Sequence, residues 1–122
     1  MWEEVLANKG VEFVYVAEVE NMVVGFLSAG PSREEELEFD GEIYGFYIED
    51  QYQGQGIGRE LFRVTVNKFL DNSFSSMFVW VLKENSAVKF YRKMGSRLVK
   101  ESYIEIGGKE YLEIALGWDQ LN

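Results

Sequence analysis

Apolar and polar positions alternate, or apolar residues run together, in short stretches along most of the chain. The β-branched and aromatic content of these stretches predicts strands at residues 11–20, 22–29, 39–49, 77–82, 97–106 and 110–116. The stretch 77–82 is apolar throughout, which is typical of a strand buried on both faces. Gly107 and Gly108 suit a tight turn and predict a hairpin of the last two strands.

Three segments have a helical pattern. Residues 58–70 bring several apolar side chains near one face at helical spacing, namely Leu61, Phe62, Val66, Phe69 and Leu70. A shorter helix is predicted from Asn85 or Ser86 to Met94, with Gly95 ending it. A further helix is predicted at residues 2–8. This order of elements predicts an α/β fold with a mixed sheet and helices on its faces, in one domain over residues 1–122.

A glycine-rich stretch, QGQGIGR at residues 53–59, joins the strand at 39–49 to the helix at 58–70. At a helix N-terminus the backbone N–H groups are unpaired and the helix dipole favours negative charge, so the stretch predicts an anion-binding loop. Its G-x-G-x-G spacing fits neither the dinucleotide fingerprint nor the mononucleotide P-loop. A tight structural turn is the alternative interpretation.

The composition excludes several kinds of site. The chain has no histidine and no cysteine, which removes disulfides, thiolate metal sites and histidine-based nucleophilic triads, and we expect no metal. A net charge of −9 argues against nucleic acid and anionic membranes and suits a cationic partner such as an amine; plain solubility is the alternative. No apolar run is long enough to span a membrane and the first residues lack a basic start, so we expect a cytoplasmic protein.

Two motifs resemble one family. The pattern Gln53-x-x-Gly56-x-Gly58 is similar to the [Q/R]-x-x-G-x-[G/A] pyrophosphate loop of the GCN5-related N-acetyltransferase (GNAT) family. Residues 85–95 (NSAVKFYRKMG) resemble that family's N-x-x-A-x-x-[FL]-Y-x-K-x-G-[FA] helix, with a departure at Ser96. The motifs lie in the family's order, and the resemblance extends from about residue 11 onward. It implies a GNAT, or acyl-CoA N-acyltransferase-like, fold with a V-shaped opening between the strands at 42–49 and 77–82.

The resemblance also implies a cofactor site for acetyl-CoA. The backbone around Phe46, Tyr47 and Ile48 would hold the pantetheine and thioester, and Asn85 would bind the CoA arm through its side chain. The pyrophosphate would lie on the glycine loop, that is, on Gln53, Gly54, Gln55, Gly56, Ile57, Gly58 and Arg59.

Two side chains are candidates for proton transfer. Tyr91, at the family's tyrosine position, would protonate the departing CoA thiolate; a packing aromatic is the alternative. Without histidine, a carboxylate acting through water is the natural base, and Glu42 lies where several family members place a glutamate base; an exposed strand-edge glutamate is the alternative. Tyr44 shares a strand face with Glu42 and would line the site. A backbone N–H near Tyr47 or Ile48 would stabilise the developing oxyanion.

The N-terminus departs from the family. Family members usually have a strand and two helices before the strand at 11–20, whereas only the predicted helix at 2–8 precedes it here. We therefore expect the usual first strand and most of the first two helices to be missing, and the strand at 12–19 to be a bare edge. Bare edges tend to be covered or paired, which predicts either a homodimer through this edge or an edge blunted by its charges.

Together these features predict an N-acetyltransferase that moves acetyl from acetyl-CoA to a primary amine of a small molecule or protein, by direct attack in a ternary complex. Because cysteine is absent, no residue is a candidate covalent acetyl carrier. A non-catalytic acyl-CoA-binding or sensing module is the alternative, which the short N-terminus would suit.

Overall fold

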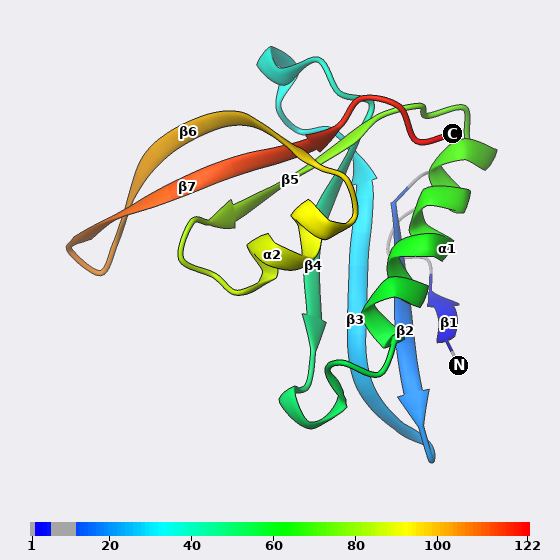
Figure 1. The fold of residues 1–122 in the computed structure, drawn as a ribbon. Helices are drawn as coiled ribbons and strands as arrows, with labels where there is room; N and C mark the ends of the chain where they lie inside the picture. The colour runs from blue at the N-terminus through cyan, green and yellow to red at the C-terminus, as the bar shows by residue number, and fades with distance from the viewer. Residues whose placement is uncertain (1, 6–11) are drawn as a thin grey trace.

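The computed structural model describes residues 2–5 and 12–122. Within them, seven strands form one mixed sheet in the order β1-β2-β3-β4-β5-β7-β6 (Figure 1). The strands are β1 Trp2–Val5, β2 Phe13–Val19, β3 Met22–Pro31, β4 Gly41–Ile48, β5 Met77–Leu82, β6 Arg97–Ile106 and β7 Lys109–Trp118. The helices are α1 Ile57–Asp71 and α2 Ala87–Lys93, with 3-10 turns η1 Glu35–Leu37 and η2 Asp50–Tyr52. The strands predicted from residue 11 onward, and the two helices among them, are confirmed.

The N-terminal segment differs from its prediction. Residues 2–5 form the strand β1 rather than the start of a helix, and residues 6–8 lie outside the described part of the chain. β1 pairs antiparallel with β2, from Trp2 opposite Ala17 to Val5 opposite Val14. The expectation of a missing first strand and a bare edge at 12–19 was therefore wrong, and a homodimer through that edge loses the free edge on which it rested.

β4 and β5 begin side by side and then diverge, as Figure 1 shows. They pair in parallel over three rungs only, the last joining Ile43 to Val79. Beyond that rung β4 continues along β3 as far as Ile48, while β5 continues along β7 as far as Leu82. The two inner edges therefore face each other across a fork without pairing, as the predicted V-shaped opening requires.

A β-bulge lies at the start of this fork. Ala29 pairs with Ile43 and Ser28 with Gly45, which leaves Tyr44 as an extra residue on β4. Gly41 and Ile43 face α1, because a side chain at Gly41 would meet the Phe69 ring at 2.7 Å and Ile43 packs in the core. A bulge shifts the alternation of a strand, so Glu42 and Tyr44 lie on the face opposite α1 while Phe46 again lies on the helix side.

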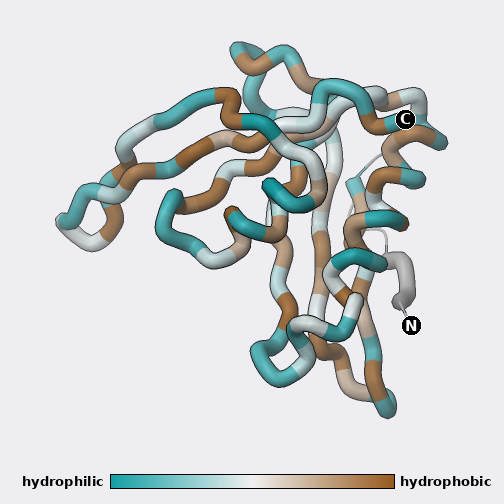
Figure 2. Tube along the Cα trace, in the orientation of Figure 1, coloured by the Kyte–Doolittle hydropathy of each residue, from teal (hydrophilic) through white to brown (hydrophobic). Residues whose placement is uncertain are grey.

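The main core fills the helix side of the sheet. Its members come from β2, β3, β5, β7 and the inner faces of both helices, including Phe13, Leu27, Leu61, Phe69 and Leu116. Figure 2 shows hydrophobic residues concentrated on the strands and on α1, with hydrophilic residues at the turns. Of the predicted apolar face of α1, Leu61, Phe62 and Phe69 are buried, and Val66 and Leu70 are half-buried. No helix in the described residues has the length and apolar character needed to cross a membrane.

Candidate active site

The glycine loop has an open backbone. Gly54 and Gly56 adopt φ values of +79° and +88°, a region that side chains rarely adopt, and a Cβ at either would meet nothing within 4 Å. Gly56 is the N-cap of α1 and has a left-handed conformation with no side-chain cap. The first N–H groups of the helix are therefore free to bind an anion, and the glycines let one approach closely.

Two side chains of the loop hold the loop itself. The amide of Gln53 donates to the Ile48 carbonyl at 3.0 Å and to Asp50 Oδ1 at 3.3 Å. That of Gln55 donates to the Gln51 carbonyl at 3.2 Å. These bonds fix the turn between β4 and α1. Gln53 and Gln55, which were predicted to contact the pyrophosphate, therefore also hold the loop in its shape.

The residues predicted to hold the cofactor arm lie along the fork. The Phe46 ring faces α2, with its centroid 5.5 Å from that of Phe90, and Ile48 packs against the core. Tyr47 points to the opposite face, where it is 52% exposed. Its backbone, rather than its side chain, borders the opening.

Asn85 lies at the end of β5 with a structural partner. Its Oδ1 accepts a hydrogen bond from the Ala87 N–H at 2.8 Å, while Ser86, the other predicted candidate, is the N-cap residue of α2 and makes no side-chain cap hydrogen bond. The side-chain NH₂ donates no hydrogen bond to a described residue and is available as a donor. Asn85 also borders a hollow of about 520 Å³ that Lys83 and Tyr111 line as well.

Tyr91 is the most buried of the predicted site residues on the helix side, at 3% exposure. Its ring lies among aromatic neighbours, with centroids 6.1 Å from Phe46 and 6.0 Å from Trp118. Burial raises the pKa of Tyr91 to about 12, so the phenol stays protonated near neutral pH. No hydrogen bond joins its hydroxyl to another described residue, which leaves the O–H free to donate to a ligand.

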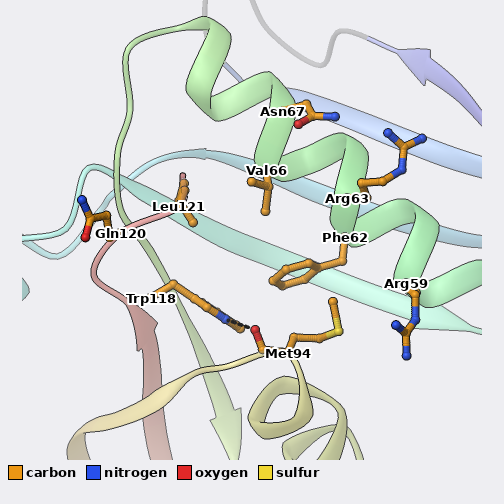
Figure 3. Close-up of a pocket in the computed structure, with 9 residues that line it drawn as sticks. All are labelled: Arg59, Phe62, Arg63, Val66, Asn67, Met94, Trp118, Gln120 and Leu121. Atoms are coloured by element: carbon orange, nitrogen blue, oxygen red, sulfur yellow. Dashed lines mark hydrogen bonds between the residues drawn. The ribbon is translucent and has the colours of Figure 1, made fainter.

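Arg59 joins the loop to a second hollow, of about 340 Å³, between α1, the end of α2 and the C-terminal residues (Figure 3). Phe62 and Trp118 line it together, with ring centroids 5.2 Å apart. The Trp118 indole donates to the Met94 carbonyl at 3.0 Å, which ties β7 to the end of α2. Arg59, the last residue of the glycine loop, thus also lines this hollow.

Glu42 is neither exposed nor free. Its side chain is 3% exposed and holds Arg33 in a bidentate ion pair, with Nε to Oε1 at 3.2 Å and Nη2 to Oε2 at 3.0 Å. The Arg33 backbone N–H adds a bond to Oε1 at 2.9 Å. Hydrogen bonding to Glu42 holds the pKa of Arg33 above its ordinary value. The interpretation of Glu42 as an exposed strand-edge residue was wrong.

Tyr44 completes this cluster. Its ring centroid lies 4.0 Å from the Arg33 guanidinium, a cation–π contact, and its hydroxyl donates to the Pro31 carbonyl at 2.7 Å. Burial and the charge of Glu12 raise the pKa of Tyr44. The prediction that Glu42 and Tyr44 share a face is confirmed, but Arg33 was missed. Glu42 pairs with Gly30 in the β3–β4 register and Arg33 lies in the connection after β3, so no local pattern in the sequence indicated their contact.

The comparisons with known proteins agree with this geometry. Residues 10–95 match the family model described as an acetyltransferase (GNAT) domain. The chain is 38% identical to the uncharacterized N-acetyltransferase YuaI of Bacillus subtilis (strain 168), over 99% of this chain and 70% of that protein. It is 30% identical to N-acetyltransferase 8 of Mus musculus, over 83% of this chain and 45% of that protein.

Solved structures share the fold. A putative streptothricin acetyltransferase from Bacillus anthracis str. Ames, in complex with acetyl coenzyme A, superposes with a TM-score of 0.80 at 18% identity, over 93% of this chain and 65% of that one. A ribosomal-protein-alanine N-acetyltransferase from Brucella melitensis gives 0.75 at 22% identity, over 88% and 68%. With the family model matched over most of its length, the chain belongs to the GNAT family of acetyltransferases.

Proposed function

We propose that this protein transfers an acetyl group from acetyl-CoA to a primary amine of a small molecule or a protein, by direct attack in a ternary complex. The observation that carries the proposal is the fork, where β4 and β5 separate after Ile43 and Val79 and the open glycine loop follows at the end of β4. A fork offers unpaired backbone groups to an extended chain, and the loop offers unpaired N–H groups to an anion. Acetyl-CoA carries both an amide-containing arm and a pyrophosphate.

The residues present fit such a co-substrate, which supplies an activated acetyl thioester. The inner edge of β4, from Phe46 to Ile48, would pair with the arm, and the loop at 53–59 with the pyrophosphate. The free NH₂ of Asn85 would donate to the arm from the β5 side. The absence of any Cβ contact at Gly54 and Gly56 leaves room for phosphate oxygens.

Proton transfers assign the two remaining roles. As the amine nitrogen bonds to the acetyl carbon and the carbon–sulfur bond breaks, the amine loses a proton and the sulfur gains one. Tyr91 is protonated and makes no hydrogen bond to another described residue, so it would donate to the sulfur. Glu42, acting through water, would take the proton of the amine, which requires the Arg33 side chain to leave its oxygens.

The ion pair keeps one alternative open. A carboxylate locked by a bidentate arginine is a poor base as it stands, which favours a non-catalytic acyl-CoA-binding or sensing module. Such a module would keep the loop and the fork but have no use for a free Tyr91 hydroxyl.

A calorimetric titration with acetyl-CoA tests the binding half of the proposal, with dephospho-CoA and free nucleotide as controls. Saturable micromolar binding is the expected result. The same sample is then supplied with a panel of primary amines while free thiol is measured. Thiol release with intersecting initial-rate patterns supports direct transfer, binding without release supports the module, and no binding overturns both.

A further inference from the structure

The ion pair at Glu42 resembles a bound ligand in its site, except that the bound group, the Arg33 guanidinium, belongs to the chain itself. The recognition elements are a carboxylate that is almost fully buried and an aromatic ring face, from Glu42 and Tyr44. The occupant is the Arg33 guanidinium, which is held by both elements at once. A carboxylate combined with an aromatic face is a chemistry that selects organic cations, ammonium as well as guanidinium.

The occupant can leave without unfolding its surroundings. The Arg33 side chain is 62% exposed, although its partner is 3% exposed, so most of the Arg33 side chain already lies in water. The backbone N–H of Arg33 also binds Glu42 Oε1 and does not depend on the side chain. If the side chain turned outward, one carboxylate hydrogen bond would persist while Oε2 and the Tyr44 face became open.

The position of the seat fits an acceptor. Glu42 precedes the last β4–β5 rung by one residue, so the seat lies at the closed end of the fork. It occupies the sheet face opposite α1, whereas Tyr91 and the glycine loop lie on the helix side. A co-substrate on the helix side and a cation on the other face would therefore meet through the fork.

Further negative charge surrounds the seat. The charge of Glu12 acts on both Arg33 and Tyr44. With Arg33 turned away, a cationic amine would meet the carboxylate of Glu42 and the charge of Glu12.

We propose that Glu42 and Tyr44 form a binding seat for the cationic head of the acceptor amine, and that Arg33 occupies this seat as an internal stand-in which a primary ammonium ion displaces. Arg33 thereby sets the selectivity of the site, because only a cation can replace it on a buried carboxylate. The identity of the seat does not depend on catalysis; the link to the acceptor rests on the proposed acetyltransferase function.

Chemical rescue tests the seat without any activity. In Arg33→Ala the missing group is an ethylguanidinium, so that ion is the first probe and n-propylammonium the second. Each should bind saturably and raise the melting temperature of Arg33→Ala by about 5 °C at ten times its dissociation constant. N-ethylurea, which has a similar shape but no charge, should have no effect.

Matched variants decide whether the seat is responsible for the stabilisation of Arg33→Ala by cations. At the same concentration, either cation should stabilise the wild type and Arg33→Lys much less than Arg33→Ala, because the resident side chain competes for the seat. Neither cation should stabilise the double variant Arg33→Ala/Glu42→Gln, whose seat has lost its charge. Arg97→Ala, which removes an exposed ion pair with Asp119, controls for general cation binding. Equal stabilisation of all variants, or none in Arg33→Ala, would overturn the proposal.

Kinetics test the link to the acceptor, with 1,4-diaminobutane as substrate. While Arg33 occupies the seat the amine cannot bind, so the KM of the wild type is raised in proportion to the small fraction of molecules whose seat is open. Arg33→Ala should therefore lower the KM for the amine by about tenfold or more. The KM for acetyl-CoA should not change. If the cations stabilise Arg33→Ala but its KM for the amine is unchanged, the seat has only a structural role. If the wild type is inactive toward every amine, the proposed acetyltransferase function is refuted, while the stabilisation of Arg33→Ala by cations still supports the seat.

Discussion

The two faces of the fork are built on different principles. On the helix side the site consists mainly of backbone geometry: unpaired strand edges, glycines with positive φ and a helix N-terminus. It also has two side-chain donors, the Tyr91 hydroxyl and the Asn85 NH₂, that make no hydrogen bond to another described residue. On the opposite face the site consists of side chains that bind one another, with Arg33 in contact with both Glu42 and Tyr44. The first face is open to a ligand as it stands, and the second must exchange a partner first.

The unpaired backbone groups and the buried charges therefore lie on opposite faces of the sheet. The co-substrate side is shaped for a ligand that backbone donors recognise, so it needs few charged side chains. The opposite face uses a buried carboxylate, which is stable only when a cation accompanies it. Substitutions on the two faces should therefore fail in different ways.

The largest expected effect is on turnover at Tyr91. Tyr91→Phe removes the donor for the leaving sulfur, and we expect kcat to fall by about 10²-fold or more, as for other acid–base groups. Acetyl-CoA affinity by calorimetry should change little, because the ring and its packing remain. An unaltered kcat would show that the sulfur leaves without Tyr91.

The next effect is on stability at Arg33. Arg33→Ala leaves the Glu42 carboxylate buried with only a backbone N–H, and we expect the free energy of unfolding to fall by about 1–2 kcal/mol, less than for a fully buried pair because Arg33 is largely exposed to solvent. Urea unfolding with Arg97→Ala as the control measures this. The loss in Arg97→Ala should be smaller, since both partners of that ion pair are exposed; equal losses would mean that the burial of Glu42 is unimportant.

The sequence predicted the helix side of the fork better than the opposite side. A glycine loop and an N-x-x-A helix are local patterns, and residues 53–59, Asn85 and Tyr91 lie where these patterns imply. The Arg33–Glu42 pair joins residues across a turn, and the bulge at Tyr44 depends on the register of two strands, which no local pattern specifies. β1 was mistaken for a helix because a four-residue strand depends on its partner β2 rather than on its own pattern.

A smaller effect separates binding from folding at Gly58. A Cβ there would meet Phe46 and Phe90 at 3.6 and 3.7 Å, which is ordinary contact, and Gly58 lies in the first turn of α1 without a positive φ. Gly58→Ala should therefore keep or slightly raise stability, since alanine favours a helix. It should weaken acetyl-CoA binding about tenfold, or by about 1.4 kcal/mol, by crowding the anion. Full affinity in calorimetry would show that the pyrophosphate lies elsewhere on the loop.

The smallest effect appears only at alkaline pH and reports the environment of Tyr91. Its pKa is raised by burial to about 12 in the folded protein, so the folded state holds the phenol proton more tightly than the unfolded chain, where tyrosine titrates near 10. This contribution to stability is complete below pH 10 and is lost as the pH rises toward 12. At pH 10.5 the loss is about 0.8 kcal/mol. Tyr91→Phe cannot show it, so the unfolding free energy of the wild type minus that of Tyr91→Phe should fall by that amount between pH 8 and pH 10.5. A constant difference would mean that the Tyr91 hydroxyl is solvated in the folded protein. Burial would then not hold the phenol in its protonated form, and the argument for Tyr91 as the proton donor would lose its physical basis.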